Sequence, residues 1–459
     1  MNDINNIKEY KQIHMIGIGG ISMSGIAEIL HSWGFIVTGS DSNKSEITDK
    51  LIKHGIPVTI GHNYDNIYRA NMVVYSAAIK HDDPELLEAQ KLNIPIIERK
   101  DFLGEITKAF ENTICISGTH GKTTTTSMIS ACFLEADLDP TIQVGAVLKE
   151  LNGNYRVGNS PNFILEACEY SESFLKFHPK SEIILNIDND HLDYFETFEN
   201  IKKAFIKYVK LLPSNGLLVL NADDKNCLDL KKYVDCKIVT YSINNPKANF
   251  IAKNIEFNSN GFARFDVYLN NNFFGAFNLS VAGYHNVLNS LACIALCYNN
   301  QVPLYSIKEA LSKFTGASRR LEYKGSINGA SIFDDYGHHP TEIEATVKAI
   351  SNKKFNESWV VFQPHTYSRT KTLLNEFAKA LLAYDHIIIT DIYAAREENI
   401  YNISSKDLVN KIKESGKDAI YLSDFNEIVN YLKNNIKPND IILTQGAGTI
   451  TQIGTMLVS

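Results

Sequence analysis

Gly118–Thr125 reads Gly-Thr-His-Gly-Lys-Thr-Thr-Thr, and the architecture of this 459-residue chain can be inferred outward from it. An apolar, strand-like run, Thr113–Ser117, precedes the segment, and a helical run, Ser127–Glu135, follows it. Glycines in such a turn let backbone N–H groups converge, and the helix N-terminus adds partial positive charge. The segment therefore predicts an α/β domain that binds nucleotide phosphate.

The side chains of this loop have distinct predicted roles. Lys122 would reach the terminal phosphates of a nucleotide, and the Thr123 hydroxyl would coordinate Mg²⁺. The usual phosphate-loop pattern has a glycine where this chain has Ile116, so the match is to a shortened loop. The residues predicted to bind the nucleotide phosphates are Gly118, Thr119, His120, Gly121, Lys122, Thr123 and Thr124.

Strand-like and helical runs alternate on both sides of the loop, which is typical of βαβ units and parallel sheets. The alternation begins at Lys11–Ile18 and restarts near Ala330–Asp334. A chain of this length is too long for one domain of ordinary size. We predict a Rossmann-like N-terminal domain (1–108), a central phosphate-loop domain (109–316) and a Rossmann-like C-terminal domain (317–459).

Composition excludes several classes of function. The formal net charge is −7 and no long basic run occurs, which argues against binding of nucleic acid or an anionic membrane surface. No apolar stretch approaches the ~18 residues of a membrane span, and the N-terminus lacks signal-peptide character. The seven cysteines form no Cys-x-x-Cys pair, so we expect buried thiols in the cytoplasm rather than disulfides or a zinc site.

A second glycine turn, Gly17–Ser22, follows the first strand-like run, and Asp41 lies about 20 residues further on. This spacing imitates the dinucleotide fingerprint, but Ser22 occupies the position of its third glycine. The residues alone leave two interpretations open: a nicotinamide cofactor, or the pyrophosphate of another ligand. Two phosphate sites in separate domains suggest that one nucleotide is a cosubstrate and the other belongs to the substrate.

Carboxylates follow two further strand-like runs of the central block, at Glu166–Glu169 and at Asn186–Asp193. The carboxyl ends of parallel strands line the functional crevice, so both clusters should face the phosphate loop. Mg²⁺ prefers oxygen ligands, and we predict Thr123, Glu169 and His191 as its ligands. The alternative is that His191, with its neighbour Asp190, only caps the following helix.

Two segments of the predicted C-terminal domain contain many hydrogen-bonding and charged side chains. Asp334–Glu342 and Gln363–Thr370 each follow an apolar strand-like run. Neither has the layout of a Ser/His/Asp triad or of a nucleophilic cysteine. The chain is therefore expected to position and neutralise phosphates rather than to form a covalent enzyme intermediate.

In this order, the strings resemble those of the Mur ligases, the ATP-dependent amide-forming enzymes of bacterial cell-wall synthesis. The resemblance spans nearly the whole chain. The strings that carry it are His14–Gly20, Met23–Gly25, Gly39–Asp41, Gly118–Thr125, Glu166–Ala167 with Glu169, Asn186 with Asp190–His191, His285–Asn289, Arg319–Arg320, Asp334–Thr341 and Gln363–Thr370.

The resemblance implies that the first domain binds a UDP-sugar, the central domain ATP, and the third an amino acid. The strings are most similar to those of members that join L-alanine to the carboxylate of UDP-N-acetylmuramate through an acyl phosphate, in peptidoglycan biosynthesis. The turn Gly17–Gly20 would then hold a uridine diphosphate instead of a nicotinamide cofactor. The implied cofactors are ATP and Mg²⁺, and a monomer or a homodimer is expected.

The resemblance also implies roles for individual residues. The UDP-sugar ligands would be Gly17, Gly19, Gly20, Ser24 and Asp41. ATP would also be contacted by His285, Asn286, Asn289 and Arg320. The amino-acid site would contain Asp335, Tyr336, His338 and Arg369, and the catalytic residues would be Lys122, His191, His338 and Arg369.

Three alternative functions predict different substrates or ligands. A recycling ligase of the same family would join a whole tripeptide to UDP-N-acetylmuramate. An oxidoreductase would bind NAD(P)H at Gly17–Gly20, and a nucleotide-dependent binding module would bind ATP without releasing phosphate.

Overall fold

A computed structural model describes residues 7–148, 151, 153–351, 353–395 and 397–459. The chain divides into two compact units. Unit 1 contains the residues up to Ile187, together with Glu199–Thr240 and Leu296–Val302. Unit 2 contains Asp188–Phe198, Tyr241–Ala295 and Pro303–Ser459.

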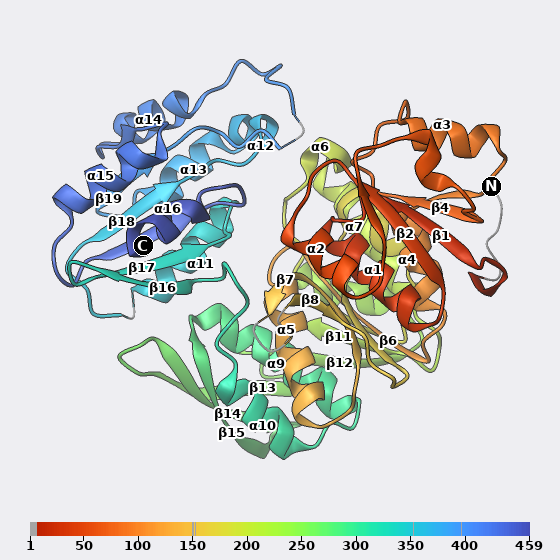
Figure 1. Cartoon of the computed structure of the whole chain (residues 1–459). Helices are drawn as coiled ribbons and strands as arrows, with labels where there is room; N and C mark the ends of the chain where they lie inside the picture. The colour runs from red at the N-terminus through yellow and green to blue at the C-terminus, as the bar shows by residue number, and fades with distance from the viewer. Residues whose placement is uncertain (1–6, 149–150, 152, 352, 396) are drawn as a thin grey trace. The chain divides into compact units, whose positions relative to one another are not determined.

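Unit 1 begins with a five-stranded parallel sheet in the order β3-β2-β1-β4-β5. One face is lined by a buried cluster that includes Ile16, Val73 and Leu86. Figure 1 shows these strands and their helices in red and orange. The elements are β1 (Gln12–Ile16), α1 (Ile21–Ser32), β2 (Ile36–Asp41), α2 (Glu46–Lys53), β3 (Val58–Ile60), β4 (Met72–Tyr75), α3 (Pro84–Lys91), β5 (Ile96–Glu98) and α4 (Arg99–Thr107).

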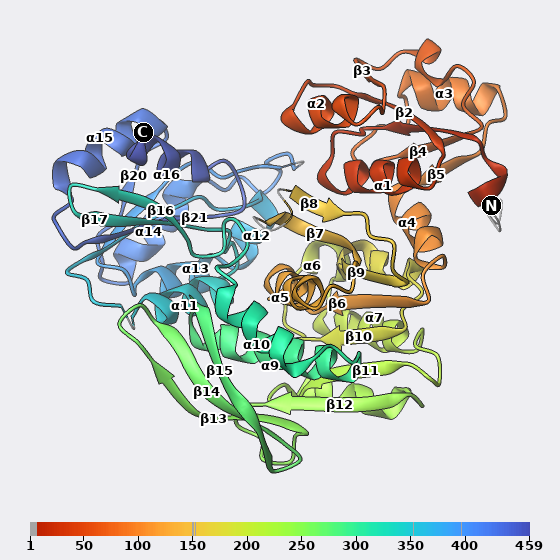
Figure 2. The ribbon, with the colours of Figure 1, turned by 60° about the horizontal axis from the view of Figure 1, so that its bottom comes forward.

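The second sheet of unit 1 has the strand order β12-β11-β10-β6-β9-β7-β8. Strand β6 pairs in parallel with β10 and β9, so the loop that follows it lies between two neighbouring strand ends. Figure 2 shows α5 beside β6, β7 and β9. The elements are β6 (Asn112–Ser117), α5 (Lys122–Glu135), β7 (Thr141–Leu148), β8 (Gly153–Arg156), β9 (Asn162–Glu166), β10 (Ser181–Ile184), α7 (Phe198–Val209), β11 (Leu217–Asn221), α8 (Lys225–Asp229) and β12 (Lys237–Ser242).

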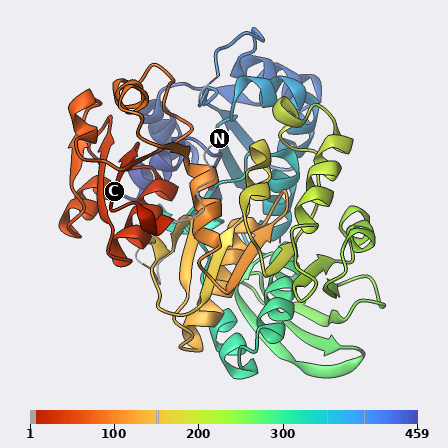
Figure 3. The same cartoon turned by 90° about the vertical axis from the view of Figure 1, so that its right-hand side faces the viewer.

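Unit 2 contains three long antiparallel strands that are green in Figure 3. Helix α10 packs against β15, and the end of β12 pairs with β13 at Tyr241 and Phe250. The elements are α6 (Leu192–Phe195), β13 (Phe250–Phe257), β14 (Phe262–Leu269), β15 (Asn272–Ala282), α9 (Tyr284–Asn299) and α10 (Leu304–Lys313).

The last sheet of unit 2 has the order β16-β17-β21-β18-β19-β20, and only β16 is antiparallel to its neighbour. Its strands are buried on both faces, because Ile441 and Leu443 of β21 face one buried cluster and Ile442 faces the other. The elements are β16 (Glu322–Ile327), β17 (Ala330–Asp335), α11 (Pro340–Ile350), β18 (Ser358–Phe362), α12 (Tyr367–Thr372), α13 (Leu374–Leu381), β19 (His386–Ile389), α14 (Ser405–Glu414), β20 (Ile420–Tyr421), α15 (Phe425–Asn435), β21 (Ile441–Gln445) and α16 (Thr451–Val458).

The parallel sheets expected from the alternating runs are confirmed in both units. Helix α5 begins at Lys122, five residues before the helical run that the sequence predicts. Its first turn contains threonines, whose intrinsic helix propensity is low. The Thr126 hydroxyl donates to the carbonyl oxygen of Lys122 within the helix, whereas the Thr123 hydroxyl donates to the Glu166 carboxylate outside it.

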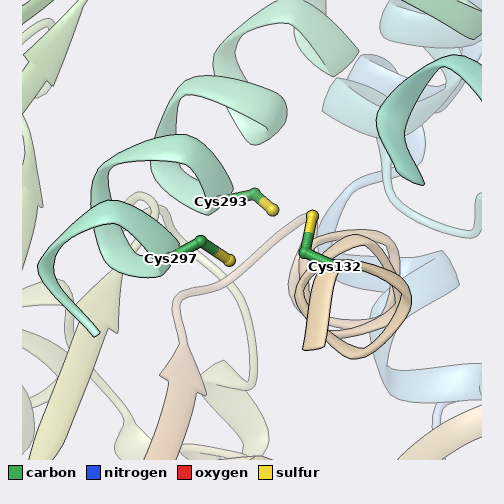
Figure 4. A group of neighbouring side chains, drawn as sticks. All are labelled: Cys132, Cys293 and Cys297. Atoms are coloured by element: carbon green, nitrogen blue, oxygen red, sulfur yellow. The ribbon is translucent and has the colours of Figure 1, made fainter. Parts of the chain in front are cut away.

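The expectation of buried thiols is confirmed for five of the seven cysteines, and none of the seven is in a disulfide bond. Figure 4 shows three of the buried ones, Cys132 on α5 and Cys293 and Cys297 one turn apart on α9. Within unit 1, the sulfur atoms of Cys132 and Cys297 lie within 4.8 Å of each other. In the described part of the chain, no helix is long and apolar enough to cross a membrane.

Candidate functional site

The backbone of the phosphate loop requires glycine at two positions of unit 1. Gly121 precedes α5 with a left-handed φ of +86°, and Gly118 has a φ of +135°. A Cβ atom on Gly118 would lie 3.0 Å from Cβ of Leu185 and 3.1 Å from the amide nitrogen of Asn186. The loop therefore turns sharply against β10, with the N-terminus of α5 directly behind it.

Lys122 is folded back onto its own loop. Its Nζ donates to the carbonyl oxygens of Gly118 at 2.5 Å and Thr119 at 3.0 Å, and lies 2.9 Å from Oε2 of Glu169. Burial disfavours the charged ammonium, but the Glu169 carboxylate outweighs that effect and raises the pKa of Lys122. The ammonium is therefore charged, and it contacts one of the predicted metal ligands.

The carboxylate of Glu166 forms a hydrogen bond with Thr123, the second predicted metal ligand in unit 1. The Thr123 hydroxyl donates to Oε2 of Glu166 at 3.1 Å, and the Gly145 amide donates to Oε1 at 2.6 Å. Glu166 has no role among the predicted site residues. Its position at the end of β9, the strand next to β6, is the signal that could have identified it.

Asn186 fixes the middle of the phosphate loop and also had no assigned role. The His120 amide donates to Oδ1 of Asn186 at 2.8 Å, and Nδ2 of Asn186 donates to the His120 carbonyl oxygen at 3.0 Å. The Thr119 amide donates to the Asn186 carbonyl oxygen. These bonds tie the loop to the chain that follows β10.

The N-terminal glycine turn contacts Asp41 through its backbone. The Gly19 amide donates to Oδ2 of Asp41 at 2.9 Å, and a Cβ atom on Gly19 would lie 2.8 Å from that oxygen. The Gly17 amide donates to the carbonyl oxygen of Ser40, and Gly20 directly precedes α1. Three predicted UDP-sugar ligands of the turn and Asp41 therefore lie together.

Ser24, the fifth predicted UDP-sugar ligand, lies in the first turn of α1. It is buried, and its hydroxyl donates to the carbonyl oxygen of Ile21 at 3.0 Å. The more exposed Ser22 accepts hydrogen bonds from Arg99 and from Gln143. The serine at the third glycine position of the fingerprint therefore links α1 to two later segments.

In unit 2, Arg369 forms a buried ion pair with Asp190. Nη2 of Arg369 lies 3.0 Å from Oδ1 of Asp190, and Nη1 lies 3.0 Å from Nδ1 of His365. Burial alone would raise the pKa of Asp190, but Arg369 and nearby histidines hold it well below its usual range. His191 lies beside this pair, with Nε2 3.7 Å from Oδ2 of Asp190.

His191 occupies the position just before α6 with a left-handed φ of +56°, and its side chain does not cap the helix. Oδ1 of Asp190 instead accepts the backbone amide of His191 at 2.7 Å. The helix-cap interpretation of the His191 side chain is therefore not supported.

His338 and His365 lie close together, with ring centroids 5.4 Å apart. Burial is the main cause that lowers the pKa of His338 to about 4 and that of His365 to about 3. Nδ1 of His338 lies 3.1 Å from the carbonyl oxygen of Tyr336, which can only accept. In the neutral ring Nδ1 therefore carries the hydrogen, and Nε2 carries the lone pair.

Asp335 and Tyr336 hold the loop after β17. The Asp335 carboxylate accepts the amides of Leu321 and Gly337 at 2.9 Å each and is 7% exposed. The Tyr336 ring lies 5.2 Å from the guanidinium of Arg320. The structure thus brings the predicted amino-acid ligands together with Arg320.

The predicted adenine ligands form the first turns of α9. Nδ2 of Asn286 donates to the carbonyl oxygen of Ala282 at 2.8 Å, and Nδ2 of Asn289 donates to Oδ1 of Asn286 at 3.2 Å. His285 follows Gly283, whose φ of +103° begins the turn into the helix. A Cβ atom on Gly283 would lie 2.7 Å from Cε1 of His285.

The predicted site residues are divided between the units. The phosphate loop, Glu169 and the UDP-sugar ligands belong to unit 1. His191, Arg320, the adenine ligands and the amino-acid ligands belong to unit 2. Within each unit the predicted residues lie in local groups, and the assignment of a ligand to each group stays a prediction.

Comparisons with known proteins cover nearly the whole chain. The sequence model described as "Mur ligase family, catalytic domain" matches residues 12–111, "Mur ligase middle domain" matches 116–297, and "Mur ligase, glutamate ligase domain" matches 319–448. The chain belongs to the Mur ligase family. The resemblance inferred from the sequence and the three-domain α/β architecture are both confirmed, whereas the exact boundaries at 108 and 316 stay predictions.

Two curated relatives are similar over their full length. The UDP-N-acetylmuramate–L-alanine ligase of Acetivibrio thermocellus is 51% identical over 98% of this chain and 96% of its own. The ligase of the same name from Alkaliphilus metalliredigens is 48% identical over 98% of each chain.

Among solved structures, the UDP-N-acetylmuramate-alanine ligase of Thermotoga maritima has a TM-score of 0.82 and 30% identity, covering 97% of this chain and 98% of its own. A murein peptide ligase from Psychrobacter arcticus has a TM-score of 0.72, with 98% of each chain covered. Its identity is 24%, so it supports the fold alone.

Proposed function

We propose that this enzyme joins L-alanine to the carboxyl group of UDP-N-acetylmuramate, with ATP as the energy source, in peptidoglycan biosynthesis. The observation that carries the proposal is the full-length similarity to a ligase of this name at 51% identity. The phosphate loop of unit 1 supports it, because its backbone amides at the start of α5 and the ammonium of Lys122 would together suit the phosphates of a nucleoside triphosphate.

The reaction has two steps. The substrate carboxylate attacks the γ-phosphate of ATP, which yields an acyl phosphate and ADP. The amine of L-alanine then attacks the acyl carbon, and inorganic phosphate leaves. Phosphoryl transfer of this kind depends on positioning and charge neutralisation, and the charged ammonium of Lys122 would neutralise the β- and γ-oxygens.

Mg²⁺ fits the donors that the phosphate loop gathers. The Thr123 hydroxyl at the start of α5 and the carboxylates of Glu166 and Glu169, at and just after the end of β9, are hard oxygen donors. When bound, the ion would neutralise charge on the phosphates. We assign Thr123 and Glu169 to it, with His191 as the third protein ligand, and Glu166 as the acceptor that orients the threonine hydroxyl.

The group around His338 and Arg369 in unit 2 suits the amino acid. Nε2 of neutral His338 is a hydrogen-bond acceptor that could orient the attacking amine. Arg369, already ordered by Asp190, would present its guanidinium to a carboxylate. We assign the substrate contacts to His338, Arg369, Asp335 and Tyr336.

The remaining proposed ligands are the UDP-sugar and the adenine of ATP. The diphosphate of the UDP-sugar would lie on the amides of Gly17, Gly19 and Gly20, with Ser24 and Asp41 beside them. Adenine would contact His285, Asn286 and Asn289, and Arg320 would reach the phosphates. A cytoplasmic location and a monomeric or dimeric state stay predictions.

The test is phosphate release by the purified protein with ATP, UDP-N-acetylmuramate and Mg²⁺. L-Alanine should support turnover, and the tripeptide L-Ala-γ-D-Glu-meso-diaminopimelate should not. Turnover with the tripeptide alone would instead identify a recycling ligase. ATP binding without phosphate release under any of these conditions would refute an enzymatic function.

Lys122→Ala should abolish ligation and leave the thermal unfolding profile recognisable. The control is Lys202→Ala, which removes an ammonium from a solvent-exposed pair with Glu199 on α7. Near-normal turnover of Lys122→Ala would show that the phosphate-loop assignment is wrong.

A further inference from the structure

A group of polar side chains in the N-terminal sheet of unit 1 lies outside the proposed reaction. His62 follows β3, and Asp83 and Glu85 stand at the start of α3. One ligand atom from each of the three lies within 4.8 Å of the other two. The side chains of Asp83 and Glu85 are 9% and 0% exposed, and that of His62 is 16% exposed.

The distances match those between ligands of one metal ion. Nδ1 of His62 lies 3.2 Å from Oδ2 of Asp83 and 3.5 Å from Oε1 of Glu85. Nitrogen and oxygen ligands at about 2.0–2.2 Å from a first-row metal lie about 2.8–3.6 Å apart in octahedral or tetrahedral geometry. Both measured separations fall within that range.

The direction of the imidazole supports the same conclusion. Nδ1 of His62 is buried and makes no hydrogen bond with any residue that the structure describes, despite the two nearby carboxylates. The other ring nitrogen, Nε2, lies 3.0 Å from the Ser42 hydroxyl. When the Ser42 hydroxyl accepts the hydrogen of Nε2, Nδ1 carries the lone pair, which is the tautomer that ligates a metal through Nδ1.

Both carboxylates are oriented by groups behind them. Oδ1 of Asp83 accepts the Glu85 amide at 2.9 Å, which leaves Oδ2 facing His62. Oε2 of Glu85 accepts from His14 at 3.0 Å and from Ser40 at 2.7 Å. Oε1 of Glu85, the oxygen nearer His62, also accepts from Nδ2 of Asn66 at 2.7 Å and from the Asn63 amide at 3.3 Å. Neighbouring groups therefore hold both carboxylates in place beside His62.

The two buried carboxylates, Asp83 and Glu85, also favour a nearby cation. Across the described residues, the only ion-pair partners of Asp83 and Glu85 are His14 and His62. Buried carboxylates are stabilised by a paired cation or a metal.

We propose that His62, Asp83 and Glu85 form a binding site for one divalent first-row transition-metal ion, of the Zn²⁺, Co²⁺ or Mn²⁺ class. One imidazole and two carboxylates are donors that suit these ions. The site joins the segment after β3 to the start of α3, and Ser42 connects it to the end of β2. The proposal does not depend on the proposed ligase reaction.

The test is isothermal titration of the full-length, chelator-treated protein with Zn²⁺, together with visible spectroscopy of its Co²⁺ form. His62→Gln should lose one equivalent of tightly bound Zn²⁺ and the corresponding Co²⁺ absorption. Asp83→Asn keeps an N-cap side chain for α3 and should weaken the same equivalent. Counting equivalents separates this site from any ion bound at the phosphate loop.

The matched control is His54→Gln, which removes a histidine that faces only one carboxylate, that of Glu28. It should retain the full stoichiometry. At about a hundred times the dissociation constant, Zn²⁺ should raise the unfolding midpoint of the wild type by about 5 °C and that of His62→Gln by much less. Equal stoichiometry in the wild type and His62→Gln, or a wild type that binds no Zn²⁺ here, would overturn the proposal and leave His62 as a structural neighbour of the two carboxylates.

Discussion

Replacing Glu182 by glutamine should change how the stability of unit 1 depends on pH. Glu182 lies in β10, between β6 and β11, and is 0% exposed. Within the described chain, neither of its carboxylate oxygens has a hydrogen-bond partner. Burial therefore raises the pKa of Glu182 well above its ordinary value, and the folded state holds the side chain as a neutral acid.

The size of the effect follows from proton linkage. A raised folded-state pKa contributes stability that is fully present below the unfolded pKa of about 4.3 and is lost as the pH rises through the folded pKa. Inside that window each pH unit costs about 1.4 kcal/mol, so two pH units cost about 2.7 kcal/mol. For a unit of roughly 200 residues, this corresponds to about 5–10 °C in the unfolding midpoint.

The measurement is thermal unfolding of the wild type and Glu182→Gln in half-unit steps from about pH 5 to about pH 8. Glutamine has the same shape and no titratable proton, so the variant should gain on the wild type as the pH rises. Glu199→Gln, on the exposed face of α7, is the control and should leave the slope unchanged. Parallel profiles for the wild type and Glu182→Gln would refute a buried neutral acid at this position.

Three further outcomes test the candidate site. Without Mg²⁺, Glu169→Gln should bind ADP about tenfold more tightly than the wild type, because Lys122 loses the carboxylate that competes with phosphate. With Mg²⁺, the variant should bind ADP more weakly than the wild type. Equilibrium titrations with ADP under both conditions test this. His191→Ala should raise the Mg²⁺ concentration for half-maximal ligation about tenfold, and an unchanged titration would leave His191 with a purely structural role. Asp190→Asn should lower the unfolding free energy at neutral pH by about 1–3 kcal/mol, because Arg369 loses its buried counter-charge. The lowered pKa of Asp190 contributes stability above about pH 4, so the difference from the wild type should shrink in acid, and a constant difference in calorimetry would contradict the ion-pair assignment.

The phosphate loop could be predicted from the sequence because its signals are local. The strand Thr113–Ser117, the glycines with left-handed φ and Lys122 lie within ten residues of one another, and the structure has β6 and α5 on either side of them. The first glycine turn was visible for the same reason. The ligand of this turn could not be predicted from its residues, because backbone amides at a helix N-terminus bind any diphosphate. Only the similarity of the whole chain to known ligases favours UDP.

The missed residues act over long separations in sequence. Asn186 holds His120 from 66 residues away, and Glu166 accepts the Thr123 hydroxyl from 43 residues away. No motif links such pairs before the strand order is known. Strand order is what brings them together, because β9 and β10 are the two neighbours of β6. His62 had no signal at all, as it stands alone between a three-residue strand and a short turn.

The contact between Lys122 and Glu169 suggests why nucleotide and metal would bind together. Lys122 is the cation that we propose for phosphate, and Glu169 is the carboxylate that we propose for Mg²⁺. Nζ of Lys122 lies 2.9 Å from Oε2 of Glu169, so the two charges neutralise each other. Phosphate arriving at the loop would draw the ammonium away and leave the carboxylate without a counter-charge in a buried place. A buried carboxylate without a partner costs several kcal/mol, so the metal would be favoured most once the nucleotide is bound. Without nucleotide, Lys122 would compete with Mg²⁺ for the Glu169 carboxylate. We therefore expect the affinity for Mg²⁺ to be weak in the absence of nucleotide.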